Sequence, residues 1–222
     1  MSSVELHSGD YVARYNRKPL DRVRRLAAYM AIPDNAEIAD FACGNGMLLH
    51  ALGNRAGKYH GVDFSPEFVA SAVEWAKREG RTNYEFHCDG ITAFCTKNLE
   101  RFDVAATLDF SEHVSDDEAV DIYSAIRRSL KPGGKLYLHS PNRDFLVELM
   151  KDRGILRQFP EHIAVRNGEQ TLALLQKAGF GASSIKLRHI PHYNVLKHLH
   201  ALGSLPLIGR YFRARLWVEA SA

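Results

Sequence analysis

The sequence has few cysteines, no long apolar run and no strong excess of either charge. Its three cysteines form no Cys-x-x-Cys pair, and an odd number argues against a disulfide framework, so we expect a reducing, cytoplasmic setting. We also expect no metal site. The first residues lack the apolar core of a secretion signal. No apolar stretch reaches the roughly 20 residues that span a bilayer. We therefore expect neither a secreted nor a membrane-spanning protein.

What remains is an ordinary globular composition. The chain has 222 residues, of which 45% are hydrophobic and 25% charged, and its formal net charge is +3. This length favours one domain with a substantial core. We expect a single domain over residues 1–222, made of an N-terminal helical cap (1–35), a core (36–180) and a C-terminal part (181–222) with the last strands.

Short apolar runs alternate with amphipathic patterns along the core. Such alternation predicts a doubly wound α/β fold of the Rossmann type, with a mostly parallel sheet, helices on both faces and an antiparallel last strand. Ligands of such sheets bind beyond the carboxyl ends of the strands. The predicted strands cover residues 36–42, 58–64, 83–88, 102–110, 134–140, 183–190 and 213–220.

A glycine turn follows the first predicted strand. Gly44 and Gly46 allow the backbone to approach a ligand that a Cβ atom would repel. The dinucleotide fingerprint needs a third glycine where this chain has Leu49, and the Gly-Lys-Ser/Thr ending of a phosphate loop is absent. The turn therefore favours a nucleoside over a dinucleotide or a bare phosphate.

Acidic residues end the next two strands. Asp63 closes the second strand, where a carboxylate can accept hydrogen bonds from both hydroxyls of a ribose. Asp89 follows the third strand and falls on the same ligand-binding edge of the sheet. Together with the glycine turn, these two residues indicate a site for a single adenosine.

Five motifs, taken in order, resemble those of the class I S-adenosylmethionine-dependent methyltransferases, especially the small-molecule enzymes that also act on quinone precursors and natural products. The motifs are "DFACGNG", "GVDFS", "CDGI", "FDVAATLDFSEHV" and "LKPGGKLYLHSP", and the similarity covers roughly residues 36–180. The resemblance implies S-adenosylmethionine as the cofactor. It also implies cofactor-binding roles for Tyr11, Asp40, Ala42, Gly44, Gly46, Asp63, Phe64, Asp89, Gly90, Ile91, Asp109, Phe110 and Ser111.

Ala42 departs from the family pattern, which has a glycine at this position. An alanine adds a methyl group and loses easy access to positive φ. We expect Ala42 to stay in the extended region at the end of the strand, with slightly less room beside the cofactor.

The reaction that the resemblance implies needs few catalytic groups, because the methyl group of the cofactor is already activated. The protein must hold the acceptor in line and, for a hydroxyl acceptor, remove its proton. His113, just past the fourth strand, is the main candidate base, since histidine accepts protons near neutral pH. His162 and His139 are weaker candidates. Tyr15, with Tyr11, resembles the N-terminal tyrosines that close over the cofactor in several relatives.

The expected function is methyl transfer to a small molecule, most simply to a hydroxyl oxygen. Transfer to nitrogen or carbon, a dinucleotide-dependent oxidoreductase and an inactive cofactor-binding partner subunit are the alternatives. Nucleic acid is not the expected acceptor, because the motif with which amino methyltransferases grip a flipped base is missing. Neither the acceptor nor the oligomeric state follows from the sequence.

The C-terminal quarter is basic. Between Glu169 and Glu219 there are seven lysines and arginines and no acidic residue, which indicates an acidic substrate or an anionic surface. The segment 192–212 interrupts the last strands and is rich in apolar residues. We expect a helical lid there, over a hydrophobic or anionic acceptor, with peripheral membrane contact as one form of this role.

Overall fold

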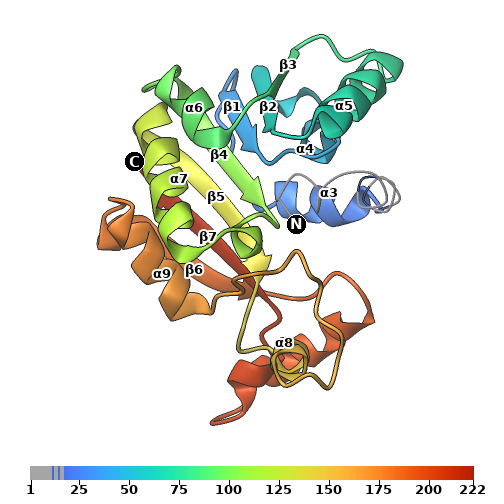
Figure 1. Ribbon diagram of the computed structural model, residues 1–222, viewed down its shortest axis with the longest axis vertical. Helices are drawn as coiled ribbons and strands as arrows, with labels where there is room; N and C mark the ends of the chain where they lie inside the picture. Colours follow the sequence, from blue (N-terminus) through green and yellow to red (C-terminus); the bar gives the residue numbers. More distant parts are fainter. Residues whose placement is uncertain (1–11, 13–14, 16–17) are drawn as a thin grey trace. The chain divides into compact units, whose positions relative to one another are not determined.

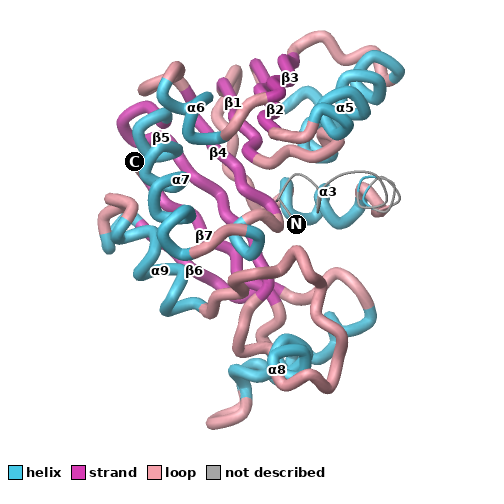
Figure 2. Tube along the Cα trace, viewed as in Figure 1, coloured by secondary structure: helices cyan, strands magenta, loops and turns pink. Residues whose placement is uncertain are grey.

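The computed structural model describes Val12, Tyr15 and residues 18–222, in which strands and helices alternate (Figure 1). Its seven-stranded sheet has the order β3-β2-β1-β4-β5-β7-β6. β2 pairs in parallel with β1 and β3, β1 pairs in parallel with β4, and β6 and β7 are antiparallel. Figure 2 shows the strands in magenta and the helices in cyan. The predicted Rossmann-like fold is confirmed. The strands are β1 (Glu37–Phe41), β2 (Lys58–Asp63), β3 (Tyr84–Cys88), β4 (Phe102–Leu108), β5 (Leu130–Pro141), β6 (Ile185–Ile190) and β7 (Arg215–Ser221).

The helices begin where the sequence provides caps. Ser65 accepts a hydrogen bond from the Phe68 N–H, and Pro66 occupies the first turn that follows. Asn167 and Gln170 form a reciprocal capping box. The α-helices are α3 (Asp21–Ala27), α4 (Met47–Leu52), α5 (Pro66–Arg78), α6 (Ile91–Thr96), α7 (Asp116–Ser129), α8 (Leu146–Asp152) and α9 (Gly168–Lys177); the 3₁₀ helices are η1 (Gly53–Arg55), η2 (Ser111–His113), η3 (Ala182–Ser184), η4 (Val195–Ser204) and η5 (Gly209–Phe212).

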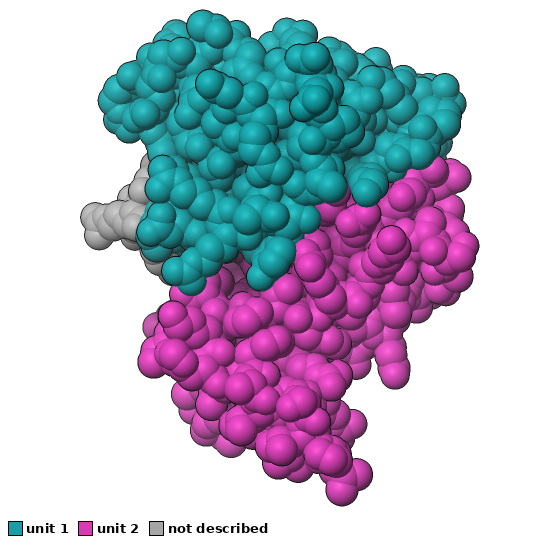
Figure 3. Space-filling model, turned by 180° about the vertical axis from the view of Figure 1, so that it is seen from behind, with its two compact units in different colours: residues 1–107, 128–135 teal, residues 108–127, 136–222 magenta. Residues whose placement is uncertain are grey.

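The chain divides into two compact units, coloured separately in Figure 3. The first comprises residues 1–107 and 128–135, and the second residues 108–127 and 136–222. The expectation of a single domain over residues 1–222 stays a prediction.

In the first unit, the edge strand β3 presents different side chains to the two faces of the sheet. Phe86 points to the side of α5, since it and Ala72 of α5 both flank the position that a Cβ atom on Gly46 would occupy. The next residue, His87, packs on Phe94 of α6, with ring centroids 4.7 Å apart. Because successive residues of a strand point to opposite faces, α5 and α6 cover opposite faces of this part of the sheet.

In the second unit, the core is built around β5 and β7, where Tyr137 and Trp217 pack with ring centroids 5.7 Å apart. The segment 192–212 forms the 3₁₀ helices η4 and η5 instead of a regular α-helix. Several large apolar side chains in it are exposed: Val195, Leu202, Leu205, Leu207 and Ile208. In the part of the chain that the structure describes, no helix is both long and apolar enough to cross a membrane.

Candidate functional site

The glycine turn after β1 is wound through the left-handed region. The φ angles are +55° at Ala42, +55° at Gly44 and +77° at Gly46. The expectation that Ala42 stays extended is therefore wrong. The turn is fixed by backbone hydrogen bonds from the Cys43 N–H to Val62 and from the Gly46 N–H to Cys43. Its path overrides the preference of alanine, at a cost of about 1–2 kcal/mol.

Tyr15 lies directly against this turn. A Cβ atom on Gly44 would come within 2.9 Å of Cε1 of the Tyr15 ring. The same ring packs edge-to-face on Phe68, with centroids 5.2 Å apart. Only glycine at position 44 therefore allows both the left-handed backbone and the neighbouring tyrosine. Tyr11, the other predicted tyrosine, lies outside the described residues.

Asp63 connects the turn to the beginning of α5. Its Oδ2 accepts a hydrogen bond from the Gly44 N–H, and its Oδ1 accepts one from the Ser65 N–H, both at 2.9 Å. The side chain is buried, with 6% of its surface exposed. Asp63 therefore holds the turn in place besides any role toward a ribose, a contact that its position after β2 did not indicate.

Asp40 is the buried acid of the first strand. Burial raises its pKa to about 7, although the hydrogen bond from the Tyr59 hydroxyl, 2.5 Å from Oδ2, favours the ionised form, and the nearby Asp63 carboxylate adds to the rise. Burial, together with Asp40, also raises the pKa of Tyr59 well above its ordinary value. A pKa near 7 would let Asp40 titrate close to neutral pH. Its partner Tyr59 lies 19 positions further along the chain, so no local pattern indicated this contact.

Three predicted cofactor-binding residues, Asp89, Gly90 and Ile91, lie at the start of α6. Asp89 accepts hydrogen bonds from the Gly90 N–H at 2.8 Å and from the Lys97 ammonium at 3.0 Å. The Lys97 hydrogen bond is the main cause that holds the pKa of Asp89 below its usual range. Ile91 is half-buried as the first residue of the helix, and Phe64 is exposed.

The other predicted residues belong to the second unit, after β4. Asp109 has a φ of +55°, and its N–H donates to the His139 carbonyl at 2.8 Å. Its Oδ1 lies 2.9 Å from Nδ1 of His139 and 3.5 Å from Arg215. Ser111 is buried and Phe110 half-buried. The backbone of Asp109 is in the left-handed region, and its side chain contacts two partners. The surrounding structure therefore fixes the conformation of this residue.

His113 and His162 lie next to each other, as the two predicted catalytic histidines. Their rings pack edge-to-face with centroids 5.1 Å apart. Nδ1 of His113 lies 2.8 Å from the Glu161 carbonyl oxygen, which can only accept, so Nδ1 carries the proton. The lone pair of the neutral ring is then on Nε2, as a general base requires.

Arg166 is a positioning residue that the sequence did not reveal. Its buried guanidinium donates to the carbonyl oxygens of Ser111 at 2.5 Å and Val114 at 2.9 Å, and it pairs with Asp116. These contacts hold the loop that carries His113. They link residues about 50 positions apart, so no local pattern could have indicated them.

Residues 38–134 match the model of a family described as a methyltransferase domain. Residues 38–134 carry a methyltransferase domain, and the resemblance to the class I family is confirmed. This methyltransferase domain contains the glycine turn, Asp63, Asp89 and His113. His162 and Arg166 lie beyond the matched residues.

Known proteins similar to the chain agree with this assignment. The chain is 32% identical over 108 residues to a ubiquinone biosynthesis O-methyltransferase of Idiomarina loihiensis, covering 49% of this chain and 43% of that protein. It is 28% identical to the protein of that name from Leptothrix cholodnii, covering 57% and 54%. The chain thus spans about half the length of the curated relatives it matches.

The fold of the methyltransferase domain and its surroundings also occurs in solved structures. A crystal structure described as a SAM-dependent methyltransferase from Archaeoglobus fulgidus superposes with a TM-score of 0.73, at 17% identity, over 96% of this chain and 100% of that one. At this identity the likeness shows the fold alone.

Proposed function

We propose that the protein transfers a methyl group from S-adenosylmethionine to a hydroxyl oxygen of a small molecule. The observation that carries the proposal is the glycine turn with its buried acids. Asp63 holds the Gly44 N–H, the backbone is left-handed at Ala42, Gly44 and Gly46, and the turn lies within residues that match a methyltransferase family. The names of the curated relatives support oxygen as the accepting atom.

The residues present fit such a cofactor. Asp40 and Asp63 are buried carboxyls beside the turn, and the first can become negatively charged near neutral pH. Both suit a ligand that has hydroxyl donors at one end and positive charge at the other. The roles proposed for Asp40, Ala42, Gly44 and Gly46 are toward the methionine and ribose, and those for Asp63, Phe64, Asp89, Gly90 and Ile91 toward the ribose and adenine. Asp109, Phe110 and Ser111 are assigned to the methionine end.

The cofactor, when bound, supplies a methyl group that its sulfonium has already activated. The chain then has to orient the acceptor and accept its proton. His113 is the proposed base, because its Nδ1–H bond to the Glu161 carbonyl directs the basic lone pair to Nε2. Arg166 keeps the loop of His113 in position, and His162 supports the ring from the side.

The acceptor is proposed to be hydrophobic or anionic. The exposed apolar side chains of residues 195–208 suit an apolar molecule or a lipid surface. Part of the positive charge of the C-terminal quarter is neutralised within the second unit and does not face an acceptor. Arg215 is buried there and donates hydrogen bonds to Tyr193 and Asp109. Co-sedimentation with anionic vesicles at low salt tests the membrane form of this role, and an absence of binding would remove it.

The experiment that tests the function has two steps. Calorimetry with S-adenosylmethionine and with nicotinamide dinucleotides should show binding of the first alone. Mass spectrometry after incubation with phenols, catechols, amines and carbon acids should then show a gain of one methyl group on a hydroxyl compound. Methylation of an amine or a carbon acid instead would correct the accepting atom. Binding without turnover of any acceptor would favour an inactive partner subunit.

A further inference from the structure

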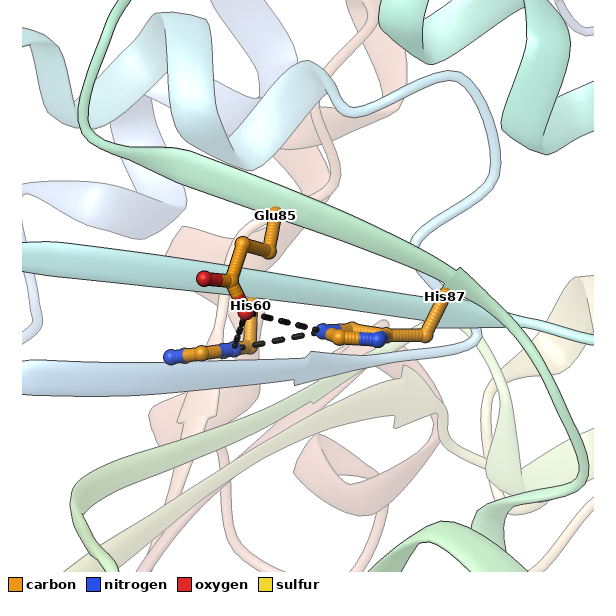
Figure 4. Close-up of side chains that lie close together, drawn as sticks. All are labelled: His60, Glu85 and His87. Carbon is orange, nitrogen blue, oxygen red and sulfur yellow. Dashed lines mark hydrogen bonds and ion pairs between the residues drawn. The ribbon is translucent and has the colours of Figure 1, made fainter.

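Three potential metal ligands meet on the paired strands β2 and β3. His60 of β2 lies opposite Glu85 of β3 in the register. His87 is two residues further along β3, so its side chain points to the same face of the sheet as that of Glu85. Figure 4 shows the three side chains converging from the two strands. The site residues proposed above do not include any of them.

The distances between the donor atoms are those of a tetrahedral site. Nδ1 of His60 is 3.3 Å from Nε2 of His87 and 3.4 Å from Oε2 of Glu85, and the last two atoms are 3.7 Å apart. Ligand atoms at about 2.0–2.2 Å from a zinc ion are about 3.3–3.6 Å from one another in a tetrahedron. The triangle therefore fits a transition metal with little movement.

The groups around the cluster prepare His60 for ligation. Nε2 of His60 lies 2.9 Å from Oε1 of Glu37, which cannot donate, and 3.3 Å from the Arg101 guanidinium, which cannot accept. The shorter contact to the carboxylate favours the tautomer with the proton on Nε2 and the lone pair on Nδ1. Arg101 holds the same oxygen of Glu37 at 2.8 Å. A carboxylate that accepts from the far nitrogen of a ligating histidine is the usual outer-shell partner in metal sites.

One carboxylate oxygen of Glu85 is directed to the two histidines. Its Oε1 is paired with the Lys58 ammonium at 2.8 Å, whereas Oε2 faces the two histidines. The exposed fractions of the side chains rise from 0% at His60 to 30% at His87 and 47% at Glu85. The cluster is therefore closed on the side of β2 and open to water on the side of β3.

We propose that Nδ1 of His60, Oε2 of Glu85 and Nε2 of His87 bind a divalent transition metal of the zinc type, with water as the fourth ligand. The metal joins the edge strand β3 to β2 and stabilises the strand that leads to Asp89. Its role is structural, and it does not depend on the methyl transfer proposed above. Two imidazoles and one carboxylate select zinc-like ions over magnesium, which prefers oxygen ligands.

A second cluster has to be distinguished in the test. Glu112, His113 and His162 also bring donor atoms within 4.8 Å of one another in the described part of the chain. These histidines belong to the proposed catalytic group. Variants in each cluster therefore identify which one binds the metal.

The experiment uses the full chain after removal of metals with a chelator. Calorimetry with Zn²⁺ and the visible spectrum with Co²⁺ should show one tetrahedral site in the wild type. Both His87→Ala and Glu85→Gln should weaken binding at this site by at least about tenfold. The exposed His198 gives the matched control, and His198→Ala and His162→Ala should leave this site unchanged. Zn²⁺ should also raise the Tm of the wild type more than that of Glu85→Gln.

Three results would overturn the proposal. The first is a Kd weaker than about 1 mM for both metals. The second is unchanged affinity in both Glu85→Gln and His87→Ala. The third is a single site that disappears in His162→Ala instead. Glu85→Gln keeps the shape of a side chain that is half exposed, so it tests the site even where the loss of an imidazole impairs folding.

Discussion

The glycine turn and the histidine loop are held by different kinds of contact. In the turn, backbone conformations and backbone donors dominate, because the Gly44 N–H and the Ser65 N–H both bond to Asp63. In the loop, the side chain of Arg166 holds carbonyl oxygens, and His113 depends on the Glu161 carbonyl. The first arrangement constrains residue types along a short stretch of chain, whereas the second depends on single residues brought in from far away.

This difference shows in which contacts the family model includes. The model covers the turn, Asp63, Asp89 and His113, but it ends at residue 134, before Glu161 and Arg166, which hold the histidine loop. A cofactor held through a glycine backbone leaves a recognisable motif. An acceptor is contacted by side chains that suit one molecule, so no general pattern has to exist.

The largest expected effect is on the histidine loop. His113→Ala should lower kcat by roughly 10²–10⁴-fold, because it removes the proposed general base. The Kd for the cofactor should stay unchanged if the turn and the loop have separate tasks. The exposed Gln176 on α9 provides the control, and Gln176→Ala should keep full activity. Single-turnover rates and calorimetry measure both quantities, and an equal loss in kcat and in cofactor affinity would contradict the separation.

Asp63→Ala should act mainly on the Kd for the cofactor, in contrast to the effect of His113→Ala on kcat. Removal of the carboxylate leaves the N–H groups of Gly44 and Ser65 without their acceptor and removes the proposed ribose contact. We expect cofactor affinity to weaken by roughly 1–3 kcal/mol, the range for buried hydrogen-bonding groups left unmet.

The matched comparison for Asp63 is Asp89, which is bonded to Lys97 at an exposed position. Asp89→Ala should therefore weaken cofactor binding less. Calorimetry with S-adenosylmethionine ranks the two variants, and unchanged affinity in a folded Asp63→Ala protein would remove the ribose assignment.

Asp40 gives the turn a pH dependence. Burial raises its pKa to about 7 in the folded protein, above the value of 3.8 for an exposed aspartate. The folded state thus holds a proton that the unfolded chain releases, and this contribution to stability is complete below about pH 4 and is lost as pH rises toward 7. Relative to Asp40→Asn, the wild type should lose roughly 2–4 kcal/mol of unfolding free energy between pH 4 and pH 8.

Tyr59→Phe sharpens this test because it should increase the pH dependence of stability that Asp40→Asn removes. The Tyr59 hydroxyl favours the ionised form of Asp40, so its removal should raise the pKa of Asp40 further and extend the loss of stability to higher pH. Urea unfolding at several pH values measures all three proteins. Parallel curves for the wild type and Asp40→Asn would show that Asp40 stays charged throughout.

The sequence predicts the contacts that are local and misses those that are not. A helix cap acts within three residues, as Ser65 does toward Phe68 at the start of α5, so a local stretch of sequence is enough to indicate it. Asp63 is correctly placed at the end of β2, but its bond to Gly44 spans 19 positions. The contact between Arg166 and Ser111 spans 55 positions, and only the folded chain brings it about.

Ala42 is the position where local preference and fold disagree, and it should give the smallest effect. Its φ of +55° suits glycine, so Ala42→Gly relieves left-handed strain. The more flexible unfolded chain offsets part of this gain. We expect a net stabilisation of about 0.5–1 kcal/mol.

The control for Ala42 is the same substitution at Ala70, which is exposed and lies inside the helix α5. Ala70→Gly relieves no strain and should destabilise the protein by about 0.5–1 kcal/mol. Opposite signs for the two substitutions in urea unfolding would show that the turn imposes its path on residue 42. Equal losses would mean that the alanine is accommodated without strain, and that the turn is held less firmly than the hydrogen bonds of Asp63 indicate.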